Sequence, residues 1–164
     1  TVSGAAKAVS HLAPRFLTVH ASGGSAMIKA AVEAVPSSHI TGVTILTSLS
    51  EGDVSDIGYR SNALDSAVGL ARIAVAAGAG AIVCSPLEIA AIRAAIGNSP
   101  IIITPGVRPA DATATDDQVR TMTPKDAISI GANLVVIGRP ITQSWKLGAL
   151  AMSERAAQIS SELV

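Results

Sequence analysis

The chain has 164 residues and no formal net charge, because 12 basic residues balance 12 acidic ones. Hydrophobic residues make up 49% and charged residues 15%, which excludes a disordered chain and argues against a basic nucleic-acid-binding surface. The longest apolar run, residues 73–84, is shorter than the roughly 20 residues that a membrane-spanning helix needs. The single cysteine, Cys84, excludes an internal disulfide and predicts a reducing compartment, the cytoplasm.

Five short apolar segments alternate with alanine-rich helical patterns along the chain. Each apolar segment is nearly continuous, which is typical of strands buried on both faces of a parallel sheet. The expected strands are 16–21, 40–48, 79–85, 101–107 and 133–139. The expected helices are 1–13, 25–35, 61–77, 86–97, 124–131 and 144–163.

Some details of these helices follow from their residues. In the helix over 61–77, the bulky apolar stripe predicts that Leu64, Val68, Ala71 and Val75 face the core. Pro86 and Gly97 mark the start and the end of the helix over 86–97. Ser22, in the run Ser-Gly-Gly, is expected to cap the helix over 25–35 rather than bind a ligand.

The alternation of helices and strands predicts a single α/β domain over residues 1–164. Two architectures fit: an open doubly wound sheet, or the last five units of a (β/α)₈ TIM barrel. A complete barrel needs at least about 200 residues, so this chain could supply only part of one. In the barrel interpretation the first strand would be an exposed edge, and the isolated chain should not be a stable monomer.

Function in parallel α/β folds lies at the carboxyl ends of the strands. The last two strand ends carry a glycine followed by an arginine: Gly106 with Arg108, and Gly138 with Arg139. A glycine allows a ligand close to the backbone, and a guanidinium can bind two phosphate oxygens at once. We therefore predict a phosphate site at Arg139, with a surface ion pair as the alternative.

The stretch 108–123 is polar and has no helical or strand pattern. Ordered loops of this length are uncommon and often serve as lids. Gln118 is a neutral hydrogen-bonding residue that suits a lid over a phosphate; a connection without a function is the alternative.

Other polar residues are weaker candidates. His20 ends a strand and is expected to be a hydrogen-bonded packing residue, while His11 and His39 suit surface or loop positions. The three histidines lack metal-ligand spacing, so no metal site is predicted. Cys84 lies in an apolar strand and is expected to be a small buried hydrophobic residue.

Six motifs together resemble one family. In order, they are TVHASGG (18–24), VTILTS (43–48), AIVCS (81–85), ITPGVRP (103–109), DDQVRTMTP (116–124) and VIGRPITQS (136–144). The chain resembles bacterial orotidine 5′-phosphate decarboxylases from residue 1 to about residue 144. The resemblance implies a homodimeric TIM barrel of which this chain supplies about the last five βα units. It also implies conversion of orotidine 5′-phosphate to UMP and CO₂, without metal or cofactor.

The resemblance implies roles for six residues. Thr47 would face the pyrimidine, Gln118 would reach the phosphate from the loop, and Arg139 with the Gly138 backbone would bind the phosphate. Arg108 and Thr1 would be further substrate-binding residues, and Thr1 would end the family's Asp-x-Lys-x-x-Asp-Ile-Pro-x-Thr signature. The family's catalytic lysine and aspartates would then lie before Thr1, on a segment that is the expected partner of this chain. No catalytic residue is assigned within it.

Two alternatives remain open at this point. A related Mg²⁺-dependent sugar-phosphate decarboxylase barrel would share the phosphate site, although the long loop containing Gln118 argues against it. A non-catalytic phosphate-binding fragment is the second, because the chain lacks the family's lysine.

Overall fold

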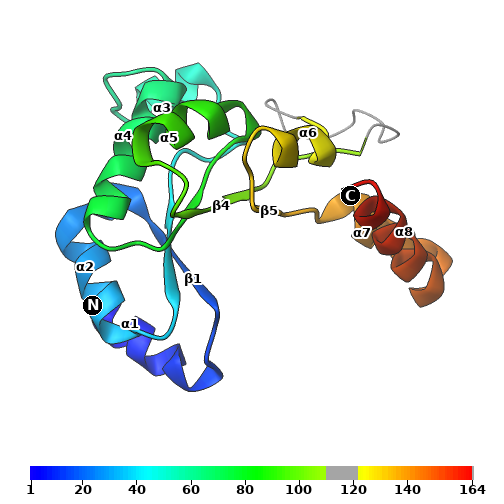
Figure 1. The fold of residues 1–164 in the computed structure, drawn as a ribbon, viewed down its shortest axis with the longest axis horizontal. Coiled ribbons are helices and arrows are strands. Elements are labelled where there is room, and N and C mark those ends of the chain that lie inside the picture. Colours follow the sequence, from blue (N-terminus) through cyan, green and yellow to red (C-terminus); the bar gives the residue numbers. More distant parts are fainter. Residues whose placement is uncertain (110–121, 164) are drawn as a thin grey trace.

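The computed structural model describes residues 1–109 and 122–163. Its five strands form one parallel sheet, paired in chain order (Figure 1). Their bounds are β1 (Phe16–His20), β2 (His39–Val43), β3 (Ala81–Val83), β4 (Ile101–Thr104) and β5 (Leu134–Val135). A doubly wound sheet reverses its strand order at a switch point, and this sheet does not. Strands paired in chain order are typical of a (β/α)₈ barrel. The interpretation that the chain forms part of such a barrel is therefore confirmed.

Helices connect the strands, as the alternation predicted. The α-helices are α1 (Val2–Val9), α2 (Gly24–Ala34), α3 (Glu51–Asp56), α4 (Ala63–Ala76), α5 (Ile89–Ile96), α6 (Pro124–Ser129), α7 (Arg139–Thr142) and α8 (Ala149–Ser161). Short 3₁₀ turns are η1 (Ser10–Leu12), η2 (Ala21–Gly23), η3 (Pro86–Glu88) and η4 (Gln143–Leu147). Within the described ranges, none of these helices is long and apolar enough to cross a membrane.

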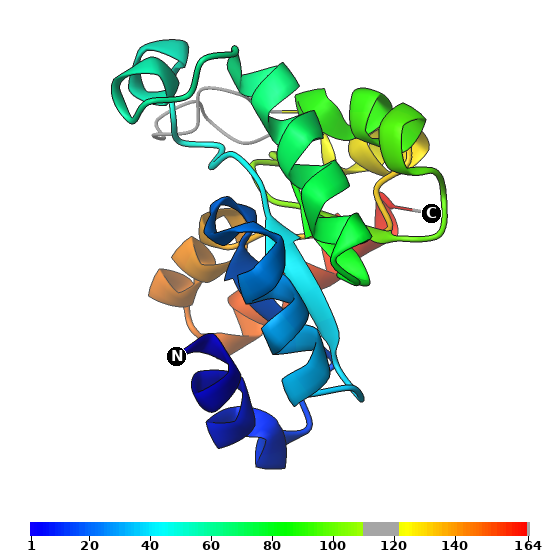
Figure 2. The same cartoon turned by 90° about the vertical axis from the view of Figure 1, so that its left-hand side faces the viewer.

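Helices α1, α2, α4 and α5 pack side by side on one face of the sheet, and Figure 2 shows α2 and α4 crossing in front of the strands. The register places Ile40, Gly42, Ile82 and Ile102 on this face, and all four side-chain positions are buried. The close approach of α4 depends on small residues. A Cβ added at Gly42 would lie 2.7 Å from the Cβ of Ala74. Alanine and glycine therefore set the distance between helix and sheet.

Three local predictions are wrong, the first of them only in part. The buried side of α4 consists of Ala63, Ser66, Ala67, Leu70, Ala71 and Ala74. Of the four residues expected to face the core, Ala71 is buried and Val68 and Val75 are half-buried against it, whereas Leu64 is exposed. Helix α2 has Gly23 at its N-cap and no side-chain capping bond, so Ser22 does not cap it. The helix expected over 144–163 is broken at Gly148, whose φ of 102° leaves the helical region.

The C-terminal elements lie apart from the main body. In Figure 1 the chain leaves β5 and enters α7 and α8, which lie well to one side of the other helices. Helix α7, turn η4 and helix α8 pack mainly on one another. Trp145, Leu147 and Leu150 are exposed in this unit.

Candidate functional site

The candidate site lies at the carboxyl edge of the sheet. All five strands are parallel, so the loops that follow them emerge at the same edge. Arg108 follows β4, and Gly138 with Arg139 follows β5, the strand paired with β4. Thr47 follows β2, nearer the middle of the sheet. The topology therefore gathers the predicted residues of the β2, β4 and β5 loops on one side of the molecule.

Gly106 turns the chain out of β4. Its φ of 75° lies in the left-handed region, which favours glycine. The next residue, Val107, is fully buried and forms an isolated bridge with Met122. This bridge brings together the two ends of the stretch 108–122 and was not visible in the sequence.

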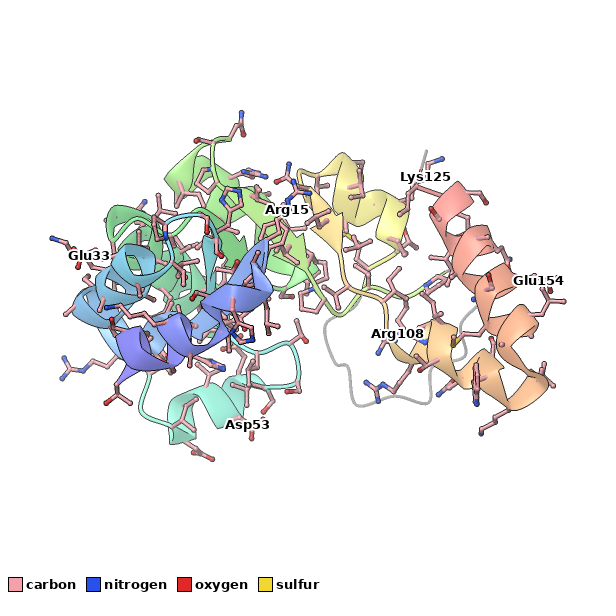
Figure 3. All side chains as sticks on the ribbon, turned by 90° about the horizontal axis from the view of Figure 1, so that it is seen from below. Arg15, Glu33, Asp53, Arg108, Lys125 and Glu154 are labelled. Atoms are coloured by element: carbon pink, nitrogen blue, oxygen red, sulfur yellow. The ribbon has the colours of Figure 1, made fainter. Side chains whose placement is uncertain are left out.

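The bridge also fixes the backbone of Arg108. Its N–H donates to the carbonyl of Met122 at 2.9 Å, and its guanidinium donates to the carbonyl of Val107 at 2.9 Å. Figure 3 shows Arg108 between the main body and the C-terminal helices, whereas Glu33 and Glu154 lie at the outer margins. These bonds hold the backbone of Arg108 in place at the base of the loop. Gln118, its predicted partner in that loop, lies outside the described residues.

Gly138 and Arg139 form the start of α7. Gly138 is the N-cap, and its carbonyl accepts from the N–H groups of Ile141 and Thr142 at 2.9 and 3.0 Å. A Cβ added at Gly138 would meet no atom within 4 Å, so packing against the described residues does not require glycine there. The described residues leave the space beside the Gly138 backbone open, and Arg139 next to it is exposed. Such a position allows a ligand to approach both the backbone and a guanidinium.

Thr47 and Thr1 occupy different surroundings. Thr47 lies in the turn closed by the bond from Leu49 N–H to the Leu46 carbonyl, and only 8% of its surface is exposed. Thr1 is the exposed N-cap of α1 and makes no side-chain capping bond. Since α1 precedes β1 at the far edge of the sheet, Thr1 is not in the loops next to Arg108 and Arg139.

The turn after β3 contains a buried carboxylate that the sequence analysis missed. Glu88 is 1% exposed, and its carboxylate accepts from the Ser85 N–H at 3.0 Å, while the Ser85 hydroxyl accepts from the Leu87 N–H at 3.4 Å. The signal was the capping pattern Ser-x-x-Glu at positions 85–88. This capping box holds the turn between the β2 and β4 loops.

Cys84 beside this turn is buried, as predicted. Burial raises the pKa of its thiol to about 12, and the nearby charge of Glu88 adds to the rise, while Thr104 and Arg93 oppose it. Such a thiol stays protonated and is a poor nucleophile near neutral pH. The interpretation as a small buried hydrophobic residue is confirmed.

The histidines give no site among the described residues. His20 is exposed at the end of β1, and its side chain has no hydrogen bond to the residues that the structure describes, so its predicted packing role is wrong. His11 is exposed at the end of α1, and His39 is exposed at the start of β2, where it stacks on Phe16. Within residues 1–109 and 122–163, no group of three metal-binding side chains comes together.

Comparisons with known proteins agree with this arrangement. Residues 1–151 match the model of the orotidine 5′-phosphate decarboxylase / HUMPS family. The chain is 54% identical to an orotidine 5′-phosphate decarboxylase of Thermobifida fusca, covering 92% of this chain and 64% of that protein. It is 49% identical to one of Frankia casuarinae, covering 92% of this chain and 55% of that protein.

A solved structure extends the likeness to the fold. The crystal structure of orotidine 5′-phosphate decarboxylase from Lactobacillus acidophilus matches with a TM-score of 0.79 at 34% identity. The match covers 99% of this chain and 69% of that one. The chain thus spans between half and two thirds of the length of the two curated relatives above. From its sequence and its partial barrel, the chain belongs to the orotidine 5′-phosphate decarboxylase / HUMPS family.

Proposed function

We propose that this chain is the substrate-binding part of an orotidine 5′-phosphate decarboxylase, the enzyme that converts orotidine 5′-phosphate to UMP and CO₂ in pyrimidine synthesis. The observation that carries the proposal is the placement of Arg108 and Gly138–Arg139 in loops of two paired strands. Relatives with this printed name share about half of their matched residues with the chain, which supports the same substrate.

The phosphate of the substrate is the expected partner of the β4 and β5 loops. We infer that Arg139 binds two phosphate oxygens while the Gly138 backbone N–H donates to a third. Arg108 adds a second positive charge at the same edge. Gln118 is proposed to reach the phosphate from the loop, although it lies outside the described residues.

The pyrimidine is proposed to lie over the middle of the sheet edge. The Thr47 hydroxyl makes no hydrogen bond to the part of the chain that the structure describes, so it is available to a polar ring edge. Thr1, beside β1 at the other side of the sheet, is proposed as a further substrate-binding residue that directly follows the segment carrying the catalytic lysine. No metal or cofactor is part of the proposal.

Binding of the remote phosphate supports the chemistry at the ring. A group held away from the reacting carbon can offset the cost of ordering a loop and of straining the substrate. The proton that replaces CO₂ at C6 would come from a lysine outside this chain. We therefore expect turnover only when the preceding three βα units are present, and an inactive chain without them.

The first test follows loss of orotidine 5′-phosphate absorbance, with and without that segment fused before Thr1. Metal-independent turnover by the fused protein is expected. Turnover of a sugar phosphate that requires Mg²⁺ would instead support the related barrel enzyme. A fused, folded protein that binds UMP but shows no turnover on either substrate would support a non-catalytic phosphate-binding protein.

The arginine assignment has its own test in the fused protein. We expect Arg139→Ala to weaken UMP binding about 10- to 100-fold, because a charged hydrogen-bonded pair is worth about 1.5–3 kcal/mol. Arg72→Ala is the matched control, since Arg72 is an exposed arginine on α4. Equal UMP affinity of the two variants in a titration would contradict the phosphate assignment.

We further infer a homodimer working in the cytoplasm, as the family resemblance implies. The single, buried cysteine supports a reducing compartment. Sedimentation of the fused protein, with and without UMP, measures the oligomeric state, and a monomer at assay concentration would contradict the dimer.

A further inference from the structure

The two faces of the sheet differ in what covers them. Helices α2 and α4 pack on the face that carries Gly42, and the register pairs Val19 of β1 with that glycine. Successive residues of a strand point to opposite faces, so His20, which follows Val19, lies on the face away from these helices. In a (β/α)₈ barrel the helices form the outer ring, and the opposite face of the sheet lines the inside. His20 therefore belongs to the inner face of the barrel.

His20 also lies at the carboxyl edge of the sheet. It is the last residue of β1 and pairs with Val43, the last residue of β2. The loops that carry the candidate site residues start from the same edge. Val43, and Val83 beyond it in the same row, are apolar and offer the imidazole no side-chain partner. The side chain of His20 is exposed and makes no hydrogen bond to the part of the chain that the structure describes.

The strand order sets where His20 lies relative to the proposed phosphate site. Strands β1 and β5 are four positions apart in the sheet. In a closed barrel of eight strands, two strands four positions apart lie across the barrel from each other. The loop after β5 carries Gly138 and Arg139, so His20 lies across the barrel mouth from the residues proposed to bind phosphate. A nucleotide held there by its phosphate directs its other end, the pyrimidine, toward β1.

The imidazole suits the polar edge of a pyrimidine. A neutral imidazole carries one N–H donor and one nitrogen acceptor. The uracil ring of UMP presents carbonyl oxygens and an N–H, which are the complementary groups. A phosphate instead presents acceptor oxygens, which suit the guanidinium groups at the other side of the mouth. The chemistry of His20 and its placement opposite Arg139 both favour the ring over the phosphate.

We infer that His20 is a further substrate-binding residue, whose imidazole hydrogen-bonds the pyrimidine ring across the barrel mouth from Arg139. The inference deepens the proposed function and rests on it for the identity of the substrate. Thr47 follows β2, the strand paired with β1, and is proposed to contact the same ring. The ring then lies between polar side chains supplied by two neighbouring strands.

The test compares UMP with ribose 5-phosphate, which lacks the pyrimidine, as ligands of the fused protein described above. His20→Ala should weaken UMP binding about 3- to 10-fold in a titration, because one neutral hydrogen bond is lost. The same variant should leave the affinity for ribose 5-phosphate unchanged. Arg139→Ala should weaken the binding of both ligands, since both carry the phosphate. A folding defect would also weaken both, so the ratio of the two affinities separates a contact with the ring from a loss of structure.

Four further variants separate hydrogen bonding from packing. His20→Asn and His20→Gln each keep a donor and an acceptor, and at least one of them should bind UMP more tightly than His20→Ala. His20→Phe keeps a ring without a hydrogen-bonding atom and should bind UMP as weakly as His20→Ala. His11→Ala is the matched control, since His11 is an exposed histidine in η1, and it should change the affinity for neither ligand.

Three results would overturn the inference. The first is a His20→Ala variant that binds UMP as tightly as the unmodified protein. The second is an equal loss of affinity for UMP and for ribose 5-phosphate in that variant. The third is full UMP affinity in His20→Phe, which would assign His20 to packing.

The same samples separate this inference from the proposed function. Suppose that the fused protein does not turn over orotidine 5′-phosphate, but His20→Ala selectively weakens UMP binding. His20 would then stand as a contact to the ring, and the decarboxylase assignment would be removed. An active fused protein whose His20→Ala variant keeps its UMP affinity and its KM would give the opposite result.

Discussion

The middle of the sheet and its two open sides differ in how they are stabilised. Strands β2, β3 and β4 lie under α4 and α5, and Ile40, Ile82 and Ile102 are almost fully buried. At the sides, Thr18 and His20 of β1 and Leu134 of β5 are exposed. The middle has its own core, whereas the sides carry apolar surface that residues 1–109 and 122–163 leave uncovered. Stability measured on this chain should therefore depend on the middle, and association should depend on the sides.

The strongest test of this difference removes bulk from the middle. Ile82 is fully buried on the face covered by α4, so Ile82→Ala leaves a cavity. Such substitutions cost about 2–5 kcal/mol of the free energy of unfolding. Leu147→Ala, at a side chain 84% exposed, should change it by less than about 0.5 kcal/mol. Urea unfolding of the two variants measures both, and similar losses would contradict the comparison.

A hydrogen-bond network at the amino ends of β4 and β5 provides the second test. The Arg93 guanidinium donates to the carbonyls of Gly131, Gly97 and Pro100, and to the side-chain oxygen of Asn133 at 2.5 Å. It joins α5 to the segments before β4 and β5. Burial lowers the pKa of Arg93, and the group remains charged at neutral pH.

We expect Arg93→Ala to cost about 2 kcal/mol of unfolding free energy, because several carbonyls lose a charged donor. Arg72→Ala, on the exposed side of α4, is the control and should cost less than about 0.5 kcal/mol. Urea unfolding compares the two. An equal effect would mean that water replaces the Arg93 bonds without loss.

Sequence patterns predicted the order of the elements better than their contacts. Continuous apolar segments located all five strands, and Pro86 and Gly97 located the η3–α5 region. Apolar size misplaced one residue on α4: Leu64 is exposed, because Ala74 and its alanine neighbours are the side chains that approach Gly42. The Ser50–Asp53 capping box could have predicted α3, which was missed.

Sequence patterns could place the candidate site only at the carboxyl ends of the strands. The two glycine–arginine pairs lie in the loops that follow β4 and β5. These two strands are neighbours in the sheet, as their order in the chain predicts. The bridge from Val107 to Met122 could not be predicted, since it joins residues across a loop with no periodic pattern. Burial of Glu88 depends on packing between neighbouring loops, which single residues do not reveal.

Two glycine substitutions provide a smaller test, because they are expected to change the free energy of unfolding in opposite directions. Gly42→Ala places a Cβ 2.7 Å from Ala74 and should cost about 1–3 kcal/mol of unfolding free energy through overpacking. Gly69→Ala, in the exposed part of α4, adds a Cβ that contacts no other element among the described residues and should add about 0.5–1 kcal/mol through helix propensity. Thermal or urea unfolding decides the signs. Stabilisation by both substitutions would mean that α4 moves away from β2 at little cost.

The smallest effect is the pH dependence from Cys84 in the middle. Its pKa is raised to about 12, above the value of about 8.5 for an unfolded cysteine. The folded chain therefore keeps a proton that the unfolded chain loses as the pH rises. Below about pH 8 this group leaves stability unchanged, and between pH 8 and 9 it should lower the free energy of unfolding by less than about 1 kcal/mol. The Cys84→Ala variant should lack this component.

Thiol labelling at pH 8 compares the accessibility of the middle of the sheet with that of its open sides. Cys84 should react with an alkylating reagent only as fast as the middle of the sheet opens, and quickly in urea. A Leu147→Cys variant in the Cys84→Ala background should react at once, because that side of the molecule is exposed. Fusing the preceding three βα units before Thr1 should leave the labelling rate of Cys84 unchanged. If the fused units slowed the labelling of Cys84 instead, the middle of the sheet would depend on them, and the middle and the sides would form one cooperative unit.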